Sequence, residues 1–106
     1  MITANYTVND NTHNLTVHGH ANYADKGKDI VCAGVSALVQ ALIGWIEEHP
    51  EYADMVSIDE IHNEVLIDCT GGEDVKAVFL MAAIGIEQIA NVYPDHVQID
   101  IIGLAD

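Results

Sequence analysis

The chain has 106 residues, half of them hydrophobic, which predicts a single domain over residues 1–106 with one packed core. Three lysines and no arginine stand against seventeen acids, for a formal net charge of −14. Binding to phosphates needs clustered Lys and Arg, so this balance argues against nucleic acid and favours a basic partner. Two cysteines in different predicted elements and an N-terminus without a basic or apolar leader favour a reducing compartment, the cytoplasm.

The hydrophobic pattern predicts five strands and two helices in the order β-β-α-β-β-α-β. This order is typical of an α+β fold, a mostly antiparallel sheet with two long apolar helices packed on it. Turn residues and prolines set the boundaries between these elements. The expected elements are strands over 2–8 and 14–20, a helix over 29–49, strands over 56–61 and 64–69, a helix over 73–93 and a strand over 97–102.

Both predicted helices are apolar nearly all round. Residues 30–46 contain Ser36 and Gln40 and are shorter than the roughly 20 residues that a membrane span needs, so we expect a helix buried in protein and no membrane partner. An ordinary surface helix has only one apolar stripe. We therefore expect a homodimer that buries the second faces.

Cys32 lies where the first long helix should begin, and His20 lies across a polar loop from it. A helix N-terminus and a nearby imidazole both favour the nucleophilic thiolate, so Cys32 is a candidate nucleophile and His20 its candidate base. Helix position alone favours a buried structural cysteine, and it is His20 and the intervening loop that favour a reactive one. The alternatives for His20 are a surface histidine or a loop cap.

Asp29 and Ser36 lie three residues before and four residues after Cys32, on the same helix face. Asp29 can orient His20 or simply cap the helix, and the sequence leaves both possibilities open. Ser36 can hydrogen-bond near the thiolate, but we favour a small residue that lets two helices pack closely.

The loop at 21–28 carries further candidates for contact with a substrate. Gly19 and Gly27 flank it, either as hinges or because turn geometry requires glycine there. Tyr23, Lys26 and Lys28 are substrate-contact candidates, and a solvated loop is the alternative.

The other histidines and Cys69 complete the list of reactive side chains. His18 shares a predicted strand face with His20, and with Cys32 they would make a partial zinc site, although zinc needs three or four ligands and no paired metal motif is present. We expect Cys69 in the core. We expect exposure for the histidines at predicted turns or element ends, which are His13, His49, His62 and His96.

Three segments together resemble the signature of the bacterial ribosomal-processing cysteine protease family, Prp. They are GHA at 19–21, GKDIVCA at 27–33 and VSAL at 35–38, and the resemblance extends through the whole chain. It implies a catalytic dyad of His20 and Cys32, a small α/β sandwich, a homodimer and no cofactor. Gly34 departs from the pattern where alanine is expected, at a cost of about 1 kcal/mol in helix propensity.

The resemblance also implies a substrate and a mechanism. The substrate is the N-terminal extension of a large-subunit ribosomal protein, cut after a hydrophobic, Phe-containing sequence. First-turn N–H groups, that of Cys32 among them, would stabilise the oxyanion, and the loop at 21–28 would close over the peptide.

Two readings besides the protease and the zinc site stay open. One is a non-catalytic acidic dimer that docks a basic ribosomal protein or assembly factor. The other is a thiol-dependent hydrolase with a different substrate, because a dyad determines the chemistry and not the pocket.

Overall fold

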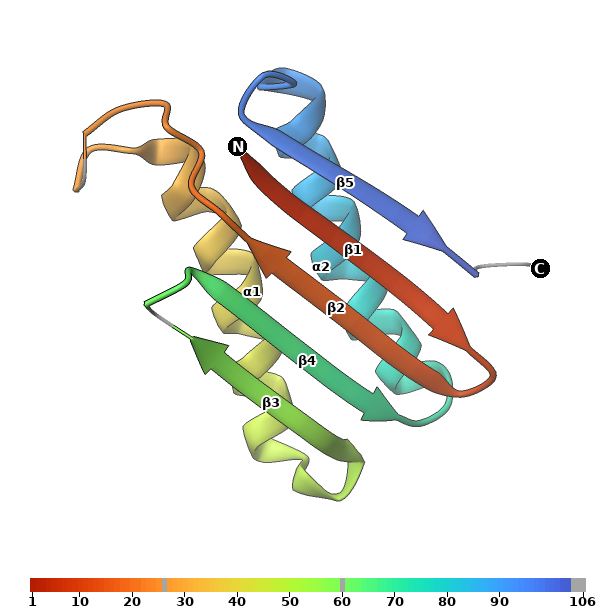
Figure 1. Ribbon diagram of the computed structural model, residues 1–106. Helices are drawn as coiled ribbons and strands as arrows, with labels where there is room; N and C mark the ends of the chain where they lie inside the picture. The colour runs from red at the N-terminus through yellow and green to blue at the C-terminus, as the bar shows by residue number, and fades with distance from the viewer. Residues whose placement is uncertain (26, 60, 104–106) are drawn as a thin grey trace.

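A computed structural model describes residues 1–25, 27–59 and 61–103 of the chain (Figure 1). Its sheet has five strands in the order β3-β4-β2-β1-β5. The pairings are antiparallel except for β1 with β5, which run parallel. The elements are β1 (Ile2–Asn9), β2 (Thr12–His18), α1 (Ile30–Glu48), the 3-10 turn η1 (Pro50–Tyr52), β3 (Ala53–Asp59), β4 (Glu64–Thr70), α2 (Glu73–Val92) and β5 (Val97–Ile102).

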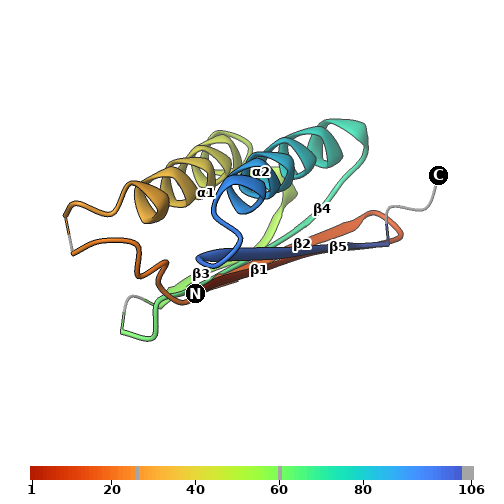
Figure 2. The same cartoon turned by 90° about the horizontal axis from the view of Figure 1, so that it is seen from above.

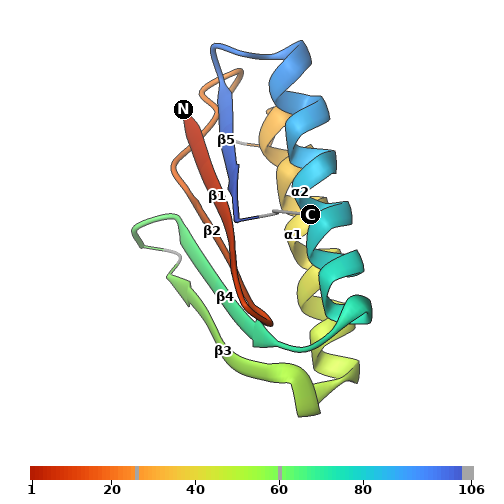
Figure 3. The ribbon, with the colours of Figure 1, turned by 90° about the vertical axis from the view of Figure 1, so that its right-hand side faces the viewer.

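Both helices cover the same face of the sheet, and the other face is open (Figures 2 and 3). This arrangement confirms the predicted α+β class and the order of the elements. Alternating sheet residues point into the core under the helices. The largest fully buried side chains are Tyr6, Leu15, Ile67, Cys69 and Val97 from the sheet and Val31, Val75, Phe79 and Ile86 from the helices.

Two glycines let α1 and α2 approach closely. A Cβ atom at Gly34 would lie 3.1 Å from the Cδ1 of Ile89, and one at Gly85 would lie 2.7 Å from the Cδ2 of Leu38. Gly34 therefore has a packing role that offsets its low helix propensity. Ser36, expected to serve this purpose, is exposed instead.

The predicted second strand, 14–20, is shifted by two residues at each end. Asp10 at φ 57° and Asn11 form a two-residue turn, so β2 already begins at Thr12. The strand ends at His18 because Gly19 has a φ of 95°, and a side chain there would overlap the carbonyl oxygen of Met1. His20 thus lies beyond the strand and not on it.

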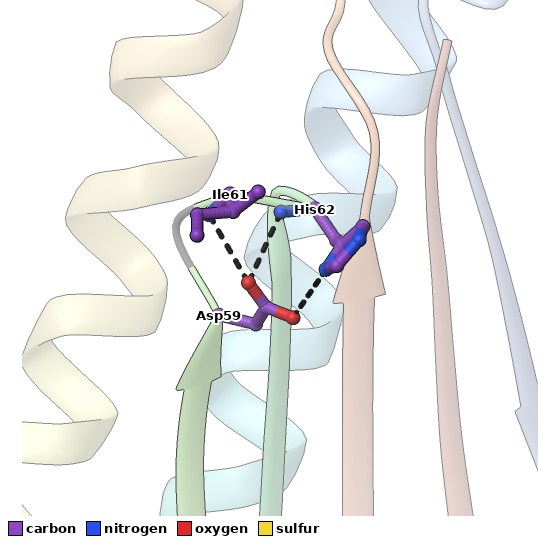
Figure 4. A network of polar contacts seen from close by, with 3 residues as sticks. All are labelled: Asp59, Ile61 and His62. Carbon is purple, nitrogen blue, oxygen red and sulfur yellow. Dashed lines mark hydrogen bonds and ion pairs between the residues drawn. The ribbon is translucent and has the colours of Figure 1, made fainter.

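The predicted third strand, 56–61, is also shifted, to Ala53–Asp59. The Asp59 carboxylate accepts hydrogen bonds from the backbone N–H groups of Ile61 and His62, both at 3.1 Å, and lies 2.6 Å from the His62 Nδ1 (Figure 4). These bonds hold Ile61 and His62 close to the end of β3, so the strand ends two residues earlier than predicted.

His13 contradicts the expectation that it is exposed, since only 2% of its surface is accessible. It lies on the core face of β2, where its Nδ1 is 2.8 Å from the Tyr6 hydroxyl and its ring lies 5.6 Å from that of Phe79. His49 and His96 are half-buried, and His62 is exposed as expected.

By length and composition, α1 and α2 could each cross a membrane. Core helices pass the same test, and here both helices line the sheet with buried side chains. The fold accounts for their apolar character on that inner face.

Candidate active site

The first turn of α1 is organised by the side chain of Asp29. One carboxylate oxygen accepts hydrogen bonds from the N–H groups of Val31 at 3.0 Å and Cys32 at 2.9 Å. The other accepts from the loop N–H groups of Tyr23 at 3.0 Å and Ala24 at 3.4 Å. These bonds, first that of Cys32, hold the pKa of Asp29 below its ordinary value. Asp29 is therefore the helix cap, and it also fastens the loop to the helix.

Cys32 is half-buried in this first turn, and its thiol is free. The backbone N–H of Ala21 donates to its Sγ at 3.3 Å. A donor aimed at sulfur, together with the positive end of the helix dipole, favours negative charge there. The geometry therefore suits a reactive thiolate better than an inert core cysteine.

Cys32 opens into a cleft of about 1000 Å³. One wall is α1, the base is formed by β2 and β4, and the other wall is the turn between β3 and β4. Figures 1 and 2 show that turn and the loop after β2 at the same end of the molecule. The lining residues include Cys32, Val35, Ser36, Val39 and Gln40 from α1, Val17 and Val65 from the sheet, Asp59, Asn63 and Glu64 from the ends of β3 and β4 and the turn between them, and Gly19, His20, Gly27, Lys28 and Asp29 from the loop.

His20 lines the same cleft and is exposed. Within the described residues no hydrogen bond joins it to Cys32, whose sulfur instead receives the N–H of the next residue, Ala21. Catalytic hydrogen bonds often form only in the substrate complex, so this open arrangement is compatible with a base at His20.

The remaining predicted site residues divide into two groups. Ser36, Gly19 and Gly27 line the cleft, with positive φ at both glycines (95° and 86°). Tyr23 does not line it. Its ring packs edge-on against Tyr93 at 5.2 Å and His96 at 5.4 Å. Of the other loop candidates, Lys28 lines the cleft and Lys26 lies outside the described residues.

Two of the N–H groups expected to stabilise the oxyanion already have hydrogen-bond partners. The Cys32 N–H donates to the Asp29 carboxylate, and the Ala33 N–H donates to the Asp29 carbonyl, so neither is available to an oxyanion.

The zinc alternative requires three or four ligands close together. Across the part of the chain that the structure describes, no three His, Cys, Asp or Glu side chains are grouped to hold a metal, and this includes His18, His20 and Cys32.

Three backbone contacts that shape the site could not be predicted from the sequence. The Ala21 N–H reaches Cys32, and the Ala21 carbonyl oxygen accepts a hydrogen bond from His96 at 2.7 Å. The Gly19 N–H donates to the Asn63 carbonyl oxygen at 3.0 Å, which ties the loop to the far wall. These contacts depend on the fold, and nothing in the local sequence signals them.

Known proteins resemble this chain both in sequence and in fold. The profile of the family described as cysteine protease Prp matches residues 1–98. The ribosomal processing cysteine protease Prp of Mycoplasma genitalium is 36% identical over 81% of this chain and 85% of its own length, and that of Staphylococcus aureus is 28% identical over 94% and 98%. A crystal structure of the S. aureus protease Prp with a covalently linked product peptide has a TM-score of 0.85 at 23% identity, over 95% of this chain and 99% of that one. The chain therefore belongs to the cysteine protease Prp family.

Proposed function

We propose that this protein is a cysteine endopeptidase that uses Cys32 as nucleophile and His20 as general acid and base, without a cofactor. The observation that carries the proposal is the half-buried thiol at the start of α1, open to a cleft that His20 also lines. The cleft extends from Gln40 on α1 to Asp59 at the end of β3, and its volume of about 1000 Å³ gives room for a peptide.

The chemistry follows two steps. The Cys32 thiolate attacks the scissile carbonyl carbon, and protonated His20 gives its proton to the leaving amine as the C–N bond breaks, which leaves a thioester. Neutral His20 then takes a proton from water, the hydroxide adds to the thioester, and the thiolate leaves. The Ala21 N–H, 3.3 Å from the sulfur, is the donor best situated to stabilise charge at this centre.

The substrate proposed is the N-terminal extension of a basic large-subunit ribosomal protein in a bacterium, cut after a hydrophobic, Phe-containing sequence. The curated relatives carry the name ribosomal processing cysteine protease, and the S. aureus protein binds a product peptide covalently. A net charge of −14 favours encounter with a basic protein. Asp29, Asp59 and Glu64 place negatively charged side chains at the cleft as well.

We propose a cytoplasmic homodimer that buries the outward face of the helices. Met81 is 68% exposed, Ile84 43% and Val92 69%, which is unusual for three apolar side chains on one helix. Light scattering at micromolar concentration measures this directly, and a monomeric mass would count against the dimer.

The experiment is cleavage of the extended N-terminal peptide of the host's large-subunit ribosomal protein, with products read by mass. Wild type should make one cut, and Cys32→Ala none, with an unchanged thermal midpoint because only a small half-buried thiol is removed. Cys69→Ala, the matched control at the buried cysteine, should retain cleavage. Turnover by Cys32→Ala would defeat the proposal, and binding without a cut by any variant would favour the acidic docking module.

A further inference from the structure

His96 contacts the loop of the candidate site from a segment that is distant in the sequence. It lies in the turn between α2 and β5, 75 residues from Ala21, and its Nδ1 is 2.7 Å from the Ala21 carbonyl oxygen. A carbonyl oxygen only accepts hydrogen bonds, so Nδ1 carries the proton and donates. The neutral Nδ1–H tautomer and the imidazolium both supply this donor, so the contact does not depend on the charge of His96.

The backbone of His96 is itself held firmly. Its N–H donates to the Tyr93 carbonyl oxygen at 3.0 Å, and its carbonyl oxygen accepts from the Ile2 N–H at 2.9 Å. The turn is thereby fixed to the end of α2 and to the beginning of β1. A side chain on such a support can hold a mobile partner in one place.

The partner is the segment that follows His20. Ala21 is 1% exposed, and its two backbone groups point to different partners, the carbonyl oxygen to His96 and the N–H to the Cys32 Sγ. Asn22, the next residue, has a φ of 54°, in the left-handed region that asparagine adopts more readily than most residues. The backbone before it is held by the two hydrogen bonds of Ala21.

We propose that His96 is a positioning residue of the protease, which holds the Ala21 backbone so that its N–H points at Cys32 and His20 stays beside the thiol. Among the contacts of the described residues, His96 touches neither the thiol nor the cleft, so it acts through the loop after His20, by its hydrogen bond to Ala21. The catalytic role of this contact rests on the proposed function, in which the Cys32 thiolate is the nucleophile. The effect of His96 on the contact between the Ala21 N–H and the sulfur does not depend on that function.

His96 also packs edge-on against Tyr23, at 5.4 Å between ring centroids, and this contact must be separated from the hydrogen bond. Three substitutions make the separation. His96→Asn keeps an N–H donor at the same number of bonds from the backbone and removes the ring. His96→Phe keeps a ring and removes the donor, and His96→Ala removes both.

The measurement is the rate of alkylation of Cys32 by iodoacetamide from pH 5 to 9, without substrate, mapped by peptide mass. Cys69 is buried and serves as the internal control for folding. Complete loss of a hydrogen bond to an ionised group changes the ionisation equilibrium of that group by about tenfold or more. Loss of the His96 side chain only loosens the bond from the Ala21 N–H to the Cys32 sulfur, so a smaller effect is expected. In His96→Ala and His96→Phe the midpoint of the profile should therefore rise by about 0.5 to 1 pH unit, and alkylation below the midpoint should slow about three- to tenfold.

His96→Asn should keep the wild-type profile, and peptide cleavage should follow the same order, with kcat lowered and KM retained in the Ala and Phe variants. A wild-type profile in His96→Phe, or an Asn variant that behaves like Ala, would overturn the proposal. Alkylation of Cys69 in any variant would show unfolding and assign a structural role to His96, which also overturns it. Failure of wild type to cut the peptide would refute the proposed function alone, because the alkylation contrast needs no substrate.

Discussion

The two helices begin in opposite ways, although both start at a loop that leaves the sheet. Helix α1 is capped by Asp29, whose side chain accepts hydrogen bonds from four backbone N–H groups of the helix and of the preceding loop. Helix α2 begins at Gly72 without any side-chain cap, and its acidic residues Glu73 and Asp74 lie within the first turn. Asp74 there bonds its neighbour Val75 and the Tyr52 hydroxyl.

The histidines beside these starts differ in the same way. At α1, His20 is exposed and lines the cleft with Cys32, whereas near the start of α2, His13 is buried against Tyr6 and Phe79. One helix start thus presents a half-buried thiol to a cleft and holds a loop in position, and the other is part of the packed core. The two helix starts therefore differ in the thiol, the loop and the cleft that meet at α1, and these make the α1 start the candidate site.

Replacement of His20 should give the largest effect at the α1 start. His20→Ala should lower kcat at least about 10²-fold, the typical contribution of a general base, with little change in stability because the side chain is exposed. Steady-state kinetics on the extension peptide measures it. His18→Ala, two residues earlier and also exposed, is the matched control, and an equal loss in both variants would remove His20 from the mechanism.

Replacement of the two aspartates separates the roles of the two helix starts. Asp29→Asn keeps a capping oxygen for Val31 and Cys32 but turns an amide toward the Tyr23 and Ala24 N–H groups. We expect near-wild-type thermal stability with cleavage reduced on the order of tenfold, because the loop is displaced. Asp74→Asn should leave cleavage unchanged, and a loss of cleavage there would break the distinction between the two helix starts.

The two glycines of the loop should differ in their effect on stability. Both have positive φ, which costs a residue with a side chain about 1–2 kcal/mol. Alanine at Gly27 meets open space, whereas alanine at Gly19 also overlaps the Met1 carbonyl oxygen. Urea unfolding should thus show a larger loss for Gly19→Ala than for Gly27→Ala, and equal losses would mean that the backbone at Gly19 moves freely.

The smallest expected effect is a pH dependence of stability from His13. Burial lowers the pKa of His13 below its ordinary value of 6.5, so as the pH falls the unfolded chain binds a proton more readily than the native state does. The free energy of unfolding should therefore have its full value above pH 6.5 and should decrease as the pH falls below 6.5. His13→Gln should flatten this part of the profile in denaturant titrations from pH 7.5 to 5.5, and an unchanged slope would assign it to other groups.

The helices and the last strand can be predicted from the sequence because residues at their own ends determine where they begin and end. Asp29, Pro50 and Pro94 stop or cap the helices, and both helices end within a residue of the prediction. The limits of β2 and β3 were missed because they depend on Gly19 meeting Met1 and on the Asp59 side chain binding the next turn. Such contacts between distant or folded-back segments leave no periodic signal.

The site shows the same division. Cys32, His20 and Asp29 can be proposed as site residues from the sequence because they share one short segment with a strong signature. The burial of His13 and the reach of His96 to Ala21 cannot be predicted in this way, because each depends on a partner brought close by the sheet or by the α2–β5 turn. Ser36 was expected between helices, but Gly34 and Gly85 make that close contact.

The most direct test of the account is covalent labelling of the enzyme with the recognition peptide carrying a chloromethyl ketone at the cleavage position. In a preparation that cleaves the parent peptide, we expect one equivalent of label, on Cys32 alone, and protection by excess parent peptide. Label on another residue, or full cleavage activity after Cys32 has been blocked, would contradict the assignment of Cys32 as the nucleophile.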